Sequence, residues 1–303
     1  MLLCCVKTIK DVFITFQKGL TTLYDSQETE SIILLTISEI THLSNATIKA
    51  FPEKEITSEQ IQQLQNILIQ LQTGKPIQYI LGYTEFYGLK FLVNPTVLIP
   101  RPETEELVEW VLSSVSSPDS YWEQLPVGSF HLLDIGTGSG CIAISLKKNL
   151  HGAQVSAIDI SPEALQTAKQ NAKLNEVEIN FIEADILNLK SDPDNYRDEN
   201  PKFEIIISNP PYVTLKDKSQ MHINVTNFEP HTALFVPEDD PLIFYKAIAD
   251  FAINNLTANG LLFFEINESY GQETVDLLTE KGFKYIELKK DMGNKYRMIR
   301  AVK

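Results

Sequence analysis

The sequence predicts an α/β protein in which a sheet with helices on both faces follows a small helical bundle and a β-hairpin connector. Two patterns predict it. From about residue 103 to the end, short apolar runs alternate with amphipathic stretches, which is typical of parallel strands joined by helices. Before residue 75, apolar residues recur at helical spacing instead. We therefore expect domains at residues 1–75 and 103–303, joined by a hairpin linker at residues 76–102.

The composition is that of a globular protein. A chain of 303 residues is long enough for two domains of roughly 150 residues each, and 43% hydrophobic and 22% charged residues are ordinary values. No apolar stretch approaches the ~20 residues that a membrane span needs. The N-terminus lacks the basic start and the cleavage site of a signal peptide. We expect a cytoplasmic protein with no membrane contact.

The net charge argues against one class of partner, and the cysteines argue against a metal or disulfide site. A formal net charge of −14 at pH 7 argues against a broad nucleic-acid surface, because such a surface needs many Lys and Arg side chains against phosphates. Cys4, Cys5 and Cys141 have neither the spacing nor the neighbouring His residues of a zinc site. We expect no metal, no disulfide framework and no direct nucleic-acid partner.

The N-terminal part shows helical signals and then a hairpin. Thr57 and Gln60 have capping-box spacing, and apolar residues then recur every three or four positions until Gly74 and Pro76 end the helix. Those apolar residues are Ile61, Leu64, Leu68 and Leu71. Earlier helices are expected within residues 9–23 and 28–42. Residues 83–87 and 89–93 are β-formers separated by Gly88, so they predict a hairpin.

Short apolar runs place the strands of the larger domain. We predict strands at residues 131–135, 154–159, 178–184, 203–208, 261–266, 284–289 and 297–302. The charged stretch at residues 189–201 is expected to be a surface loop.

A glycine-rich loop follows the first of these strands and precedes a helical run at residues 142–148. Glycine lets the backbone turn sharply and approach a ligand. The dinucleotide fingerprint would place its third glycine at position 141, which is Cys141, so the spacing instead resembles the first motif of Rossmann-like methyltransferases. A tight turn without a ligand is the alternative. The candidate cofactor-binding residues here are Gly136, Thr137, Gly138, Ser139 and Gly140.

Acidic residues follow the next two strands. Asp159 ends the second strand at about the 20-residue distance from the glycine loop at which such folds place a ribose-binding carboxylate. A carboxylate can accept hydrogen bonds from both ribose hydroxyls. Asp185 and Ile186, after the third strand, lie where related folds meet adenine, but Asp185 can equally cap the following turn.

The tetrad Asn209-Pro210-Pro211-Tyr212 follows the fourth strand, at the sheet edge where open α/β folds bind ligands. An amide or exocyclic amino nitrogen is a poor nucleophile because its lone pair is delocalised. The Asn209 side-chain oxygen and the Pro210 carbonyl can accept hydrogen bonds from such a nitrogen and stabilise its growing positive charge. The prolines stiffen this geometry, and Tyr212 can stack on a planar group. The alternative is a chain break beside a core aromatic.

With these motifs the chain resembles the HemK/PrmC family, the protein-glutamine N5 methyltransferases that modify translation release factors. The resemblance covers nearly the whole chain. Besides the glycine loop and the tetrad, it includes the segments at residues 76–80, 85–89, 98–105, 229–234 and 291–297. These segments discriminate better than the tetrad, which DNA adenine methyltransferases share.

The resemblance implies a class I methyltransferase fold that uses S-adenosylmethionine. The glycine loop, Asp159 and Asn209 would contact this cofactor, and the tetrad would hold the glutamine of the Gly-Gly-Gln loop in bacterial-type release factors. The helical N-terminal domain would help to bind that protein substrate, and Arg101 and Glu103 would shape the substrate channel. Family analogy also favours a monomer. The chain departs from many relatives in having Glu265-Ile266-Asn267 in place of Glu-His-Gly.

Two other functions fit parts of the sequence. An adenine-N6 methyltransferase acting on DNA or RNA faces the same chemical problem, but it would need base flipping and a basic channel. The acidic chain and the helical N-terminus count against it. A catalytically silent binding module would be expected to have lost a loop glycine or Asn209, and these residues are present.

Overall fold

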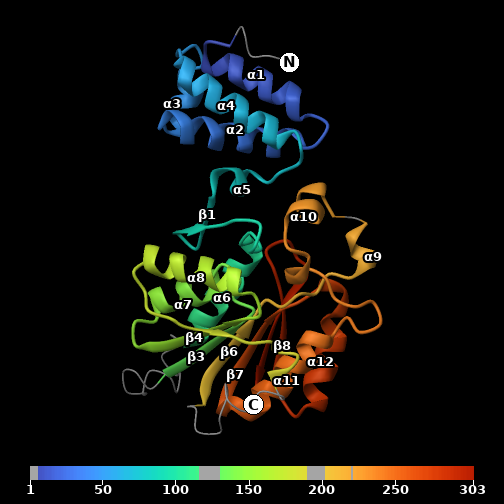
Figure 1. Ribbon diagram of the computed structural model, residues 1–303. Helices are drawn as coiled ribbons and strands as arrows, with labels where there is room; N and C mark the ends of the chain where they lie inside the picture. Colours follow the sequence, from blue (N-terminus) through green and yellow to red (C-terminus); the bar gives the residue numbers. More distant parts are fainter. Residues whose placement is uncertain (1–5, 116–129, 190–201, 220) are drawn as a thin grey trace. The chain divides into compact units, whose positions relative to one another are not determined.

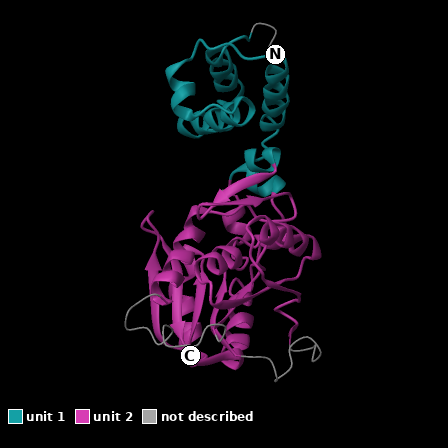
Figure 2. Ribbon diagram, turned by 90° about the vertical axis from the view of Figure 1, so that its left-hand side faces the viewer, with its two compact units in different colours: residues 1–81, 222–228 teal, residues 82–221, 229–303 magenta. Residues whose placement is uncertain are grey.

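The computed structural model describes residues 6–115, 130–189, 202–219 and 221–303. The chain divides into two compact units, coloured separately in Figure 2. The first unit comprises residues 1–81 and 222–228, and the second comprises residues 82–221 and 229–303. The domain boundaries expected at residues 75 and 102 stay predictions. From residue 190 to 201, the expected surface loop lies outside the described residues.

The first unit is a bundle of short helices around one apolar core (Figure 1). Its helices are α1 (Ile9–Leu20), α2 (Ser26–Thr41), α3 (Asn45–Ala50), α4 (Ser58–Leu71) and α5 (Ile77–Leu81). Helix α4 starts at the expected capping box, in which the Thr57 hydroxyl accepts from the Gln60 N–H at 3.2 Å and the Gln60 side chain accepts from the Thr57 N–H at 3.0 Å. The capping box and the helices expected before it are confirmed.

One short helix of the first unit comes from the distant second half of the chain. Helix α10 (Ile223–Phe228) belongs to the helical unit. His222 Nε2 lies 2.6 Å from the Leu23 carbonyl oxygen, and the His222 ring packs 5.6 Å from the Tyr24 ring. Asn224 Nδ2 donates to the Tyr24 hydroxyl at 3.3 Å. Nothing local in residues 222–228 signals that this segment joins the helical unit, so its placement was not predicted from the sequence.

The second unit contains a hairpin and a seven-stranded sheet of order β5-β4-β3-β6-β7-β9-β8. The hairpin strands are β1 (Tyr83–Phe86) and β2 (Leu89–Leu92), which pair antiparallel as expected. The strands of the large sheet are β3 (Phe130–Ile135), β4 (Ala153–Asp159), β5 (Asn180–Glu183), β6 (Phe203–Ser208), β7 (Leu256–Glu265), β8 (Lys284–Lys290) and β9 (Tyr296–Val302). Each lies at a position where the apolar runs predicted a strand.

The expectation of a parallel sheet is wrong for the last strand. Neighbouring strands from β5 to β7 are parallel, but β9 pairs antiparallel with both β7 and β8. The connection from β8 to β9 covers only residues 291–295, whereas a parallel pair needs a crossover of about a dozen residues or more. The chain must therefore turn back directly, and β9 inserts between β7 and β8.

Helices cover both faces of the sheet (Figure 1). One face carries α6 (Pro102–Val115), α7 (Cys141–Asn149) and α8 (Pro162–Leu174), and the other carries α11 (Ile243–Asn255) and α12 (Gly271–Glu280). The shorter helices are α9 (Leu215–Lys218), η3 (His231–Ala233) and η4 (Glu268–Tyr270). This arrangement confirms the predicted α/β class.

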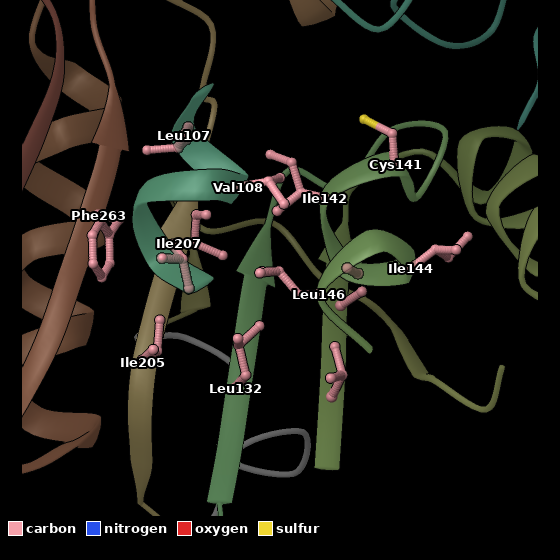
Figure 3. Packing of buried hydrophobic residues seen from close by; sticks show 14 of the residues in the cluster. Leu107, Val108, Leu132, Cys141, Ile142, Ile144, Leu146, Ile205, Ile207 and Phe263 are labelled. Atoms are coloured by element: carbon pink, nitrogen blue, oxygen red, sulfur yellow. The ribbon is translucent and has the colours of Figure 1, made fainter. Parts of the chain in front are cut away.

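Alternation along the strands sends side chains into two cores. Leu132 and Ile205 pack beneath α6 and α7, as Figure 3 shows, whereas their neighbours Leu133 and Ile206 pack on the opposite face. Successive side chains of a strand point to opposite faces, so strands buried on both sides are apolar throughout. Cys141 lies in the first core, where burial raises the pKa of its thiol to about 12.

The parallel strands bring their carboxyl ends to one edge. Ile135 of β3 pairs with Ser208 of β6, and Ser208 pairs in turn with Phe264 of β7. The Ser208 hydroxyl also donates to the Ile135 carbonyl at 2.6 Å. The residues that directly follow these positions therefore lie side by side.

Among the described helices, none combines the length and the hydropathy needed to cross a membrane.

Candidate functional site

A cavity of about 370 Å³ lies at this edge of the sheet, and its described lining belongs to the second unit. The glycine loop, the end of β4 and the tetrad all contribute to it. The expected site residues in its lining are Gly136, Gly138, Asp159, Asn209, Pro210 and Pro211. Thr137, Ser139, Gly140 and Tyr212 are described but are not among the lining residues. The sheet thus brings two motifs far apart in sequence to one space.

Gly136 and Gly138 present bare backbone to this cavity. Their φ angles are +77° and +55°, in the left-handed region that favours glycine. A Cβ atom at Gly138 would meet nothing within 4 Å, and one at Gly136 would lie 4.0 Å from the Asn209 carbonyl oxygen. A side chain at either position would therefore project into open space that a ligand can fill.

Gly140 serves the packing of the helix that follows. Its φ angle is +82°, and a Cβ atom there would lie 2.9 Å from Ile144 Cδ1 and 3.2 Å from Ala168 Cβ. This glycine lets α7 and α8 approach each other. Within the glycine loop, Gly136 and Gly138 thus face the cavity, whereas Gly140 permits close packing of the two helices.

Thr137 and Ser139 support the loop from behind. The Thr137 N–H donates to the Ile158 carbonyl at 3.0 Å, and its hydroxyl donates to Asp134 Oδ2 at 2.7 Å. The Ser139 carbonyl accepts from Asn171 Nδ2 at 2.9 Å. Both residues are buried. These bonds fix the loop to β3, to the end of β4 and to α8.

Asp134 is a site residue that the sequence analysis did not single out. It is fully buried, and burial raises the pKa of its carboxyl to about 7, although the hydrogen bond from Thr137 opposes that shift. A carboxylate in an apolar strand is costly, so its presence directly beneath the loop indicates a functional constraint. An acidic residue inside the apolar run of residues 132–135 was the available signal.

Asp159 reaches the cavity from the end of β4. Its Oδ2 accepts from the Gly138 N–H at 2.8 Å, and its Oδ1 accepts from the Ser161 N–H at 2.9 Å. Burial raises the pKa of the carboxyl, and these backbone hydrogen bonds oppose the shift. Each carboxylate oxygen has a second lone pair for a ligand hydroxyl. Bare glycine backbone beside an oriented carboxylate therefore fits a nucleoside such as the adenosine of S-adenosylmethionine.

Asp185 and Ile186 also line the cavity, beyond β5. The Asp185 carboxylate accepts from the Leu187 N–H at 2.9 Å and from Asn188 Nδ2 at 2.7 Å. Both readings of Asp185 are thus compatible with its position, because it stabilises the following turn and also borders the cavity.

The tetrad is held by two buried residues that received no role from sequence. Thr104, in the first turn of α6, and Glu265, the last residue of β7, are each 2% exposed. The Thr104 hydroxyl donates to Glu265 Oε2 at 2.6 Å and accepts from Asn209 Nδ2 at 3.2 Å. The Tyr212 hydroxyl donates to Glu265 Oε1 at 3.0 Å. An acidic residue at the carboxyl end of an apolar strand could have pointed to Glu265.

The polar groups of this cluster have shifted pKa values. Burial raises the pKa of the Glu265 carboxyl, while hydrogen bonds from Thr104 and Tyr212 and the charge of Arg297 oppose the shift. Burial, together with the Glu265 charge, raises the pKa of the Tyr212 hydroxyl well above its usual range. Tyr212 therefore stays a neutral hydrogen-bond donor at physiological pH.

Comparison with known proteins finds matches over both units. The model of the methyltransferase small domain matches residues 121–228, and the model of the PrmC N-terminal domain matches residues 16–82. A release factor glutamine methyltransferase of Flavobacterium psychrophilum is 46% identical over 97% of this chain and 98% of its own length. The enzyme of the same name from Bacteroides thetaiotaomicron is 38% identical over 94% of this chain and 96% of its own length.

Among solved structures, the crystal structure of a release factor-specific protein-(glutamine-N5) methyltransferase from Alicyclobacillus acidocaldarius is 25% identical to this chain. It covers 70% of this chain and 99% of its own, with a TM-score of 0.40.

The two kinds of glycine predict separable effects of substitution. Gly138→Ala should weaken binding of S-adenosylmethionine by about tenfold or more, because the added methyl group enters the cavity, and should cost about 1–2 kcal/mol of stability from its positive φ. Gly140→Ala should cost about 2–5 kcal/mol, because a clash in the α7–α8 contact adds to the strain. Calorimetric titration and chemical denaturation measure the two quantities. Equal stability losses in both variants would contradict this separation.

Asp134 predicts a dependence of stability on pH. Between about pH 4 and pH 7, the Asp134 carboxyl is protonated in the folded protein and ionised in the unfolded chain, because its pKa is raised on folding. Its stabilising contribution to the free energy of unfolding is therefore complete below about pH 4 and is lost as pH rises through about 7. Asp134→Asn removes this loss. The free energy of unfolding of the variant relative to the parent should therefore rise by on the order of 2 kcal/mol between pH 5 and pH 8. Denaturation at both pH values without cofactor tests this, and a pH-independent difference would exclude it.

Proposed function

The chain belongs to the release factor glutamine methyltransferase family, and from this premise we propose that it methylates the side-chain amide nitrogen (N5) of the glutamine in the Gly-Gly-Gln motif of bacterial-type release factors. S-adenosylmethionine is the proposed methyl donor. The observation that carries the proposal is the shared cavity, which two glycines of the loop and the first three residues of the tetrad line together. The Asn209 carbonyl oxygen stands 4.0 Å from the position of a Cβ at Gly136.

The tetrad suits a planar amide nitrogen. Such a nitrogen is nucleophilic only when its lone pair is no longer conjugated with the neighbouring carbonyl group. Two oxygens that accept hydrogen bonds from its N–H groups favour that state. The Asn209 side-chain oxygen and the Pro210 carbonyl are the proposed acceptors, and both residues line the cavity. As the bond to the methyl group forms, the same oxygens stabilise the positive charge that grows on the nitrogen, and loss of a proton then removes that charge. Pro210 and Pro211 restrict the backbone that carries them.

The proposed cofactor site uses residues that are already arranged for it. Gly136 and Gly138 would lie against the cofactor, Asp159 would accept from the ribose hydroxyls, and Asn209 would border both ligands. Thr137, Ser139 and Gly140 would act indirectly by holding the loop. When bound, S-adenosylmethionine supplies an electrophilic methyl group on a sulfonium.

The segments at residues 98–105 and 229–234 support a substrate channel. Arg101 forms an ion pair with Glu229, whose side chain is 1% exposed, and Glu229 also accepts from the Ile99 N–H at 3.3 Å. This pair joins the two segments, and each contributes lining residues, including Leu98 and Thr232. We infer that Arg101 and Glu103 border the path of the substrate glutamine, and that residues 1–75 contribute to binding the release factor.

Transfer of a labelled methyl group tests the proposed function directly. Purified enzyme and labelled S-adenosylmethionine are incubated with a release factor, with the same factor carrying a substituted Gly-Gly-Gln glutamine, and with adenine-containing DNA. Label is expected on the wild-type factor and should map to that glutamine. Label on DNA would replace the substrate assignment by an adenine-N6 methyltransferase, and no label on any substrate would refute the activity.

Asn209→Ala tests the role of the tetrad. Turnover should fall by on the order of 10²- to 10³-fold, because one hydrogen bond that stabilises the developing charge is lost. Binding of S-adenosylmethionine should remain mostly intact, because the glycine loop and Asp159 are unchanged. Single-turnover transfer to the release factor and calorimetric titration of the cofactor measure the two effects. Unchanged turnover would refute the role of Asn209.

A further inference from the structure

We propose that Glu265, acting through Thr104, is a positioning residue that determines which end of the Asn209 side-chain amide faces the substrate. In its turnover measurement the inference rests on the proposed function, whereas its spectroscopic test does not. A chain of hydrogen bonds starts at this buried carboxylate, outside the tetrad, and ends at the tetrad's first residue.

The direction of the chain follows from the number of protons available. A threonine hydroxyl has one hydrogen, and Thr104 donates it to Glu265 Oε2 across 2.6 Å. The Tyr212 hydroxyl donates to the other oxygen, Oε1. Both oxygens of Glu265 therefore act as acceptors, as in an ionised carboxylate.

The oxygen of Thr104 can then only accept from Asn209. An amide offers an acceptor at Oδ1 and donors at Nδ2, so the contact at 3.2 Å requires Nδ2. Because the amide is planar, Oδ1 must lie on the side away from Thr104. The substrate amide needs an acceptor, so this is the productive orientation. The opposite orientation would offer an N–H to a substrate N–H.

The surroundings make this constraint strong. Thr104 and Glu265 are each 2% exposed, so water does not easily replace a lost partner, and an unpaired buried polar group is costly. Glu265 also holds the far end of the tetrad through Tyr212. One carboxylate thus orients both the first and the last residue of the segment that is proposed to grip the glutamine.

Thr104→Val and Thr104→Ser form the test pair. Valine keeps the shape and removes the hydroxyl, whereas serine keeps the hydroxyl. With release factor as substrate, kcat of the valine variant should fall on the order of 10- to 100-fold because the reacting amide is misaligned, while KM changes by less than about threefold. The serine variant should stay within about threefold of the parent.

Thr274→Val is the matched control. Thr274 is fully buried in the same unit, but its hydroxyl, in α12, donates to the carbonyl of Tyr270, the last residue of η4. This variant should retain the parental kcat. A valine variant at 104 with parental kcat, or a serine variant as impaired as the valine variant, would overturn the proposal. If Thr104→Val does not fold, Glu265→Gln is judged by the same criteria, because glutamine can accept only one of the two hydroxyl hydrogens.

A second readout needs neither substrate nor cofactor. In enzyme labelled with [15N]asparagine, the side-chain NH2 signal that disappears in Asn209→Ala reports this amide. Its exchange with water should be at least about tenfold faster in Thr104→Val than in Thr104→Ser. Equal exchange in the two variants would overturn the proposal. If the parent enzyme does not methylate the release factor, the proposed function fails and this measurement decides the inference.

Discussion

The site depends on the register of β6 between β3 and β7. Pairing of Ser208 with Ile135 on one side and with Phe264 on the other places Asn209 between the glycine loop and Glu265. Side chains alternate along a strand, so a slip of β6 by one residue would move each of its side chains into the other core and separate the Ser208 hydroxyl from the Ile135 carbonyl. Every residue of β6 is buried, and its side chains pack into the cores on both faces of the sheet. The same hydrophobic burial that stabilises the sheet therefore fixes the relative position of the two motifs.

Several carboxylates are buried in or beside the site, although burying a carboxylate reduces the stability of the fold. Burial raises the pKa values of Asp134, Asp159 and Glu265, which means that each loses free energy when it ionises inside the folded protein. Their hydrogen bonds to Thr137, to backbone N–H groups and to Tyr212 recover part of that loss. Groups that reduce stability at neutral pH yet are arranged in one place mark a site where function constrains the sequence. Of these three carboxylates, Asp159 lines the cavity, where it would face the proposed cationic cofactor.

The site features that the sequence predicted are each marked by a local pattern of residues. The glycine loop, Asp159 and the tetrad each follow an apolar strand directly, and a parallel sheet brings strand ends together, so their meeting at one edge followed from local pattern and one rule of topology. Thr104 and Glu265 could not be paired in this way, because they lie 161 positions apart and only the packing of α6 against the sheet brings them together. The placement of α10 in the helical unit likewise depends on long-range contacts. The antiparallel direction of β9 depends on a β8–β9 connection that is too short for a crossover.

The departure at Asn267 shows how such long-range contacts change the meaning of a local difference. At the position where the family resemblance implies glycine, Asn267 Nδ2 donates to the Tyr212 carbonyl and to Asp217 Oδ2, each at 3.0 Å. Its Oδ1 accepts from the Ser269 N–H at 2.9 Å. A glycine at this position would offer none of these three side-chain bonds. Asn267 thus departs from the expected family motif, yet it adds a hydrogen bond to Tyr212 at the end of the tetrad. Glu265 and Asn267, two residues apart, hold Tyr212 by its hydroxyl and by its carbonyl.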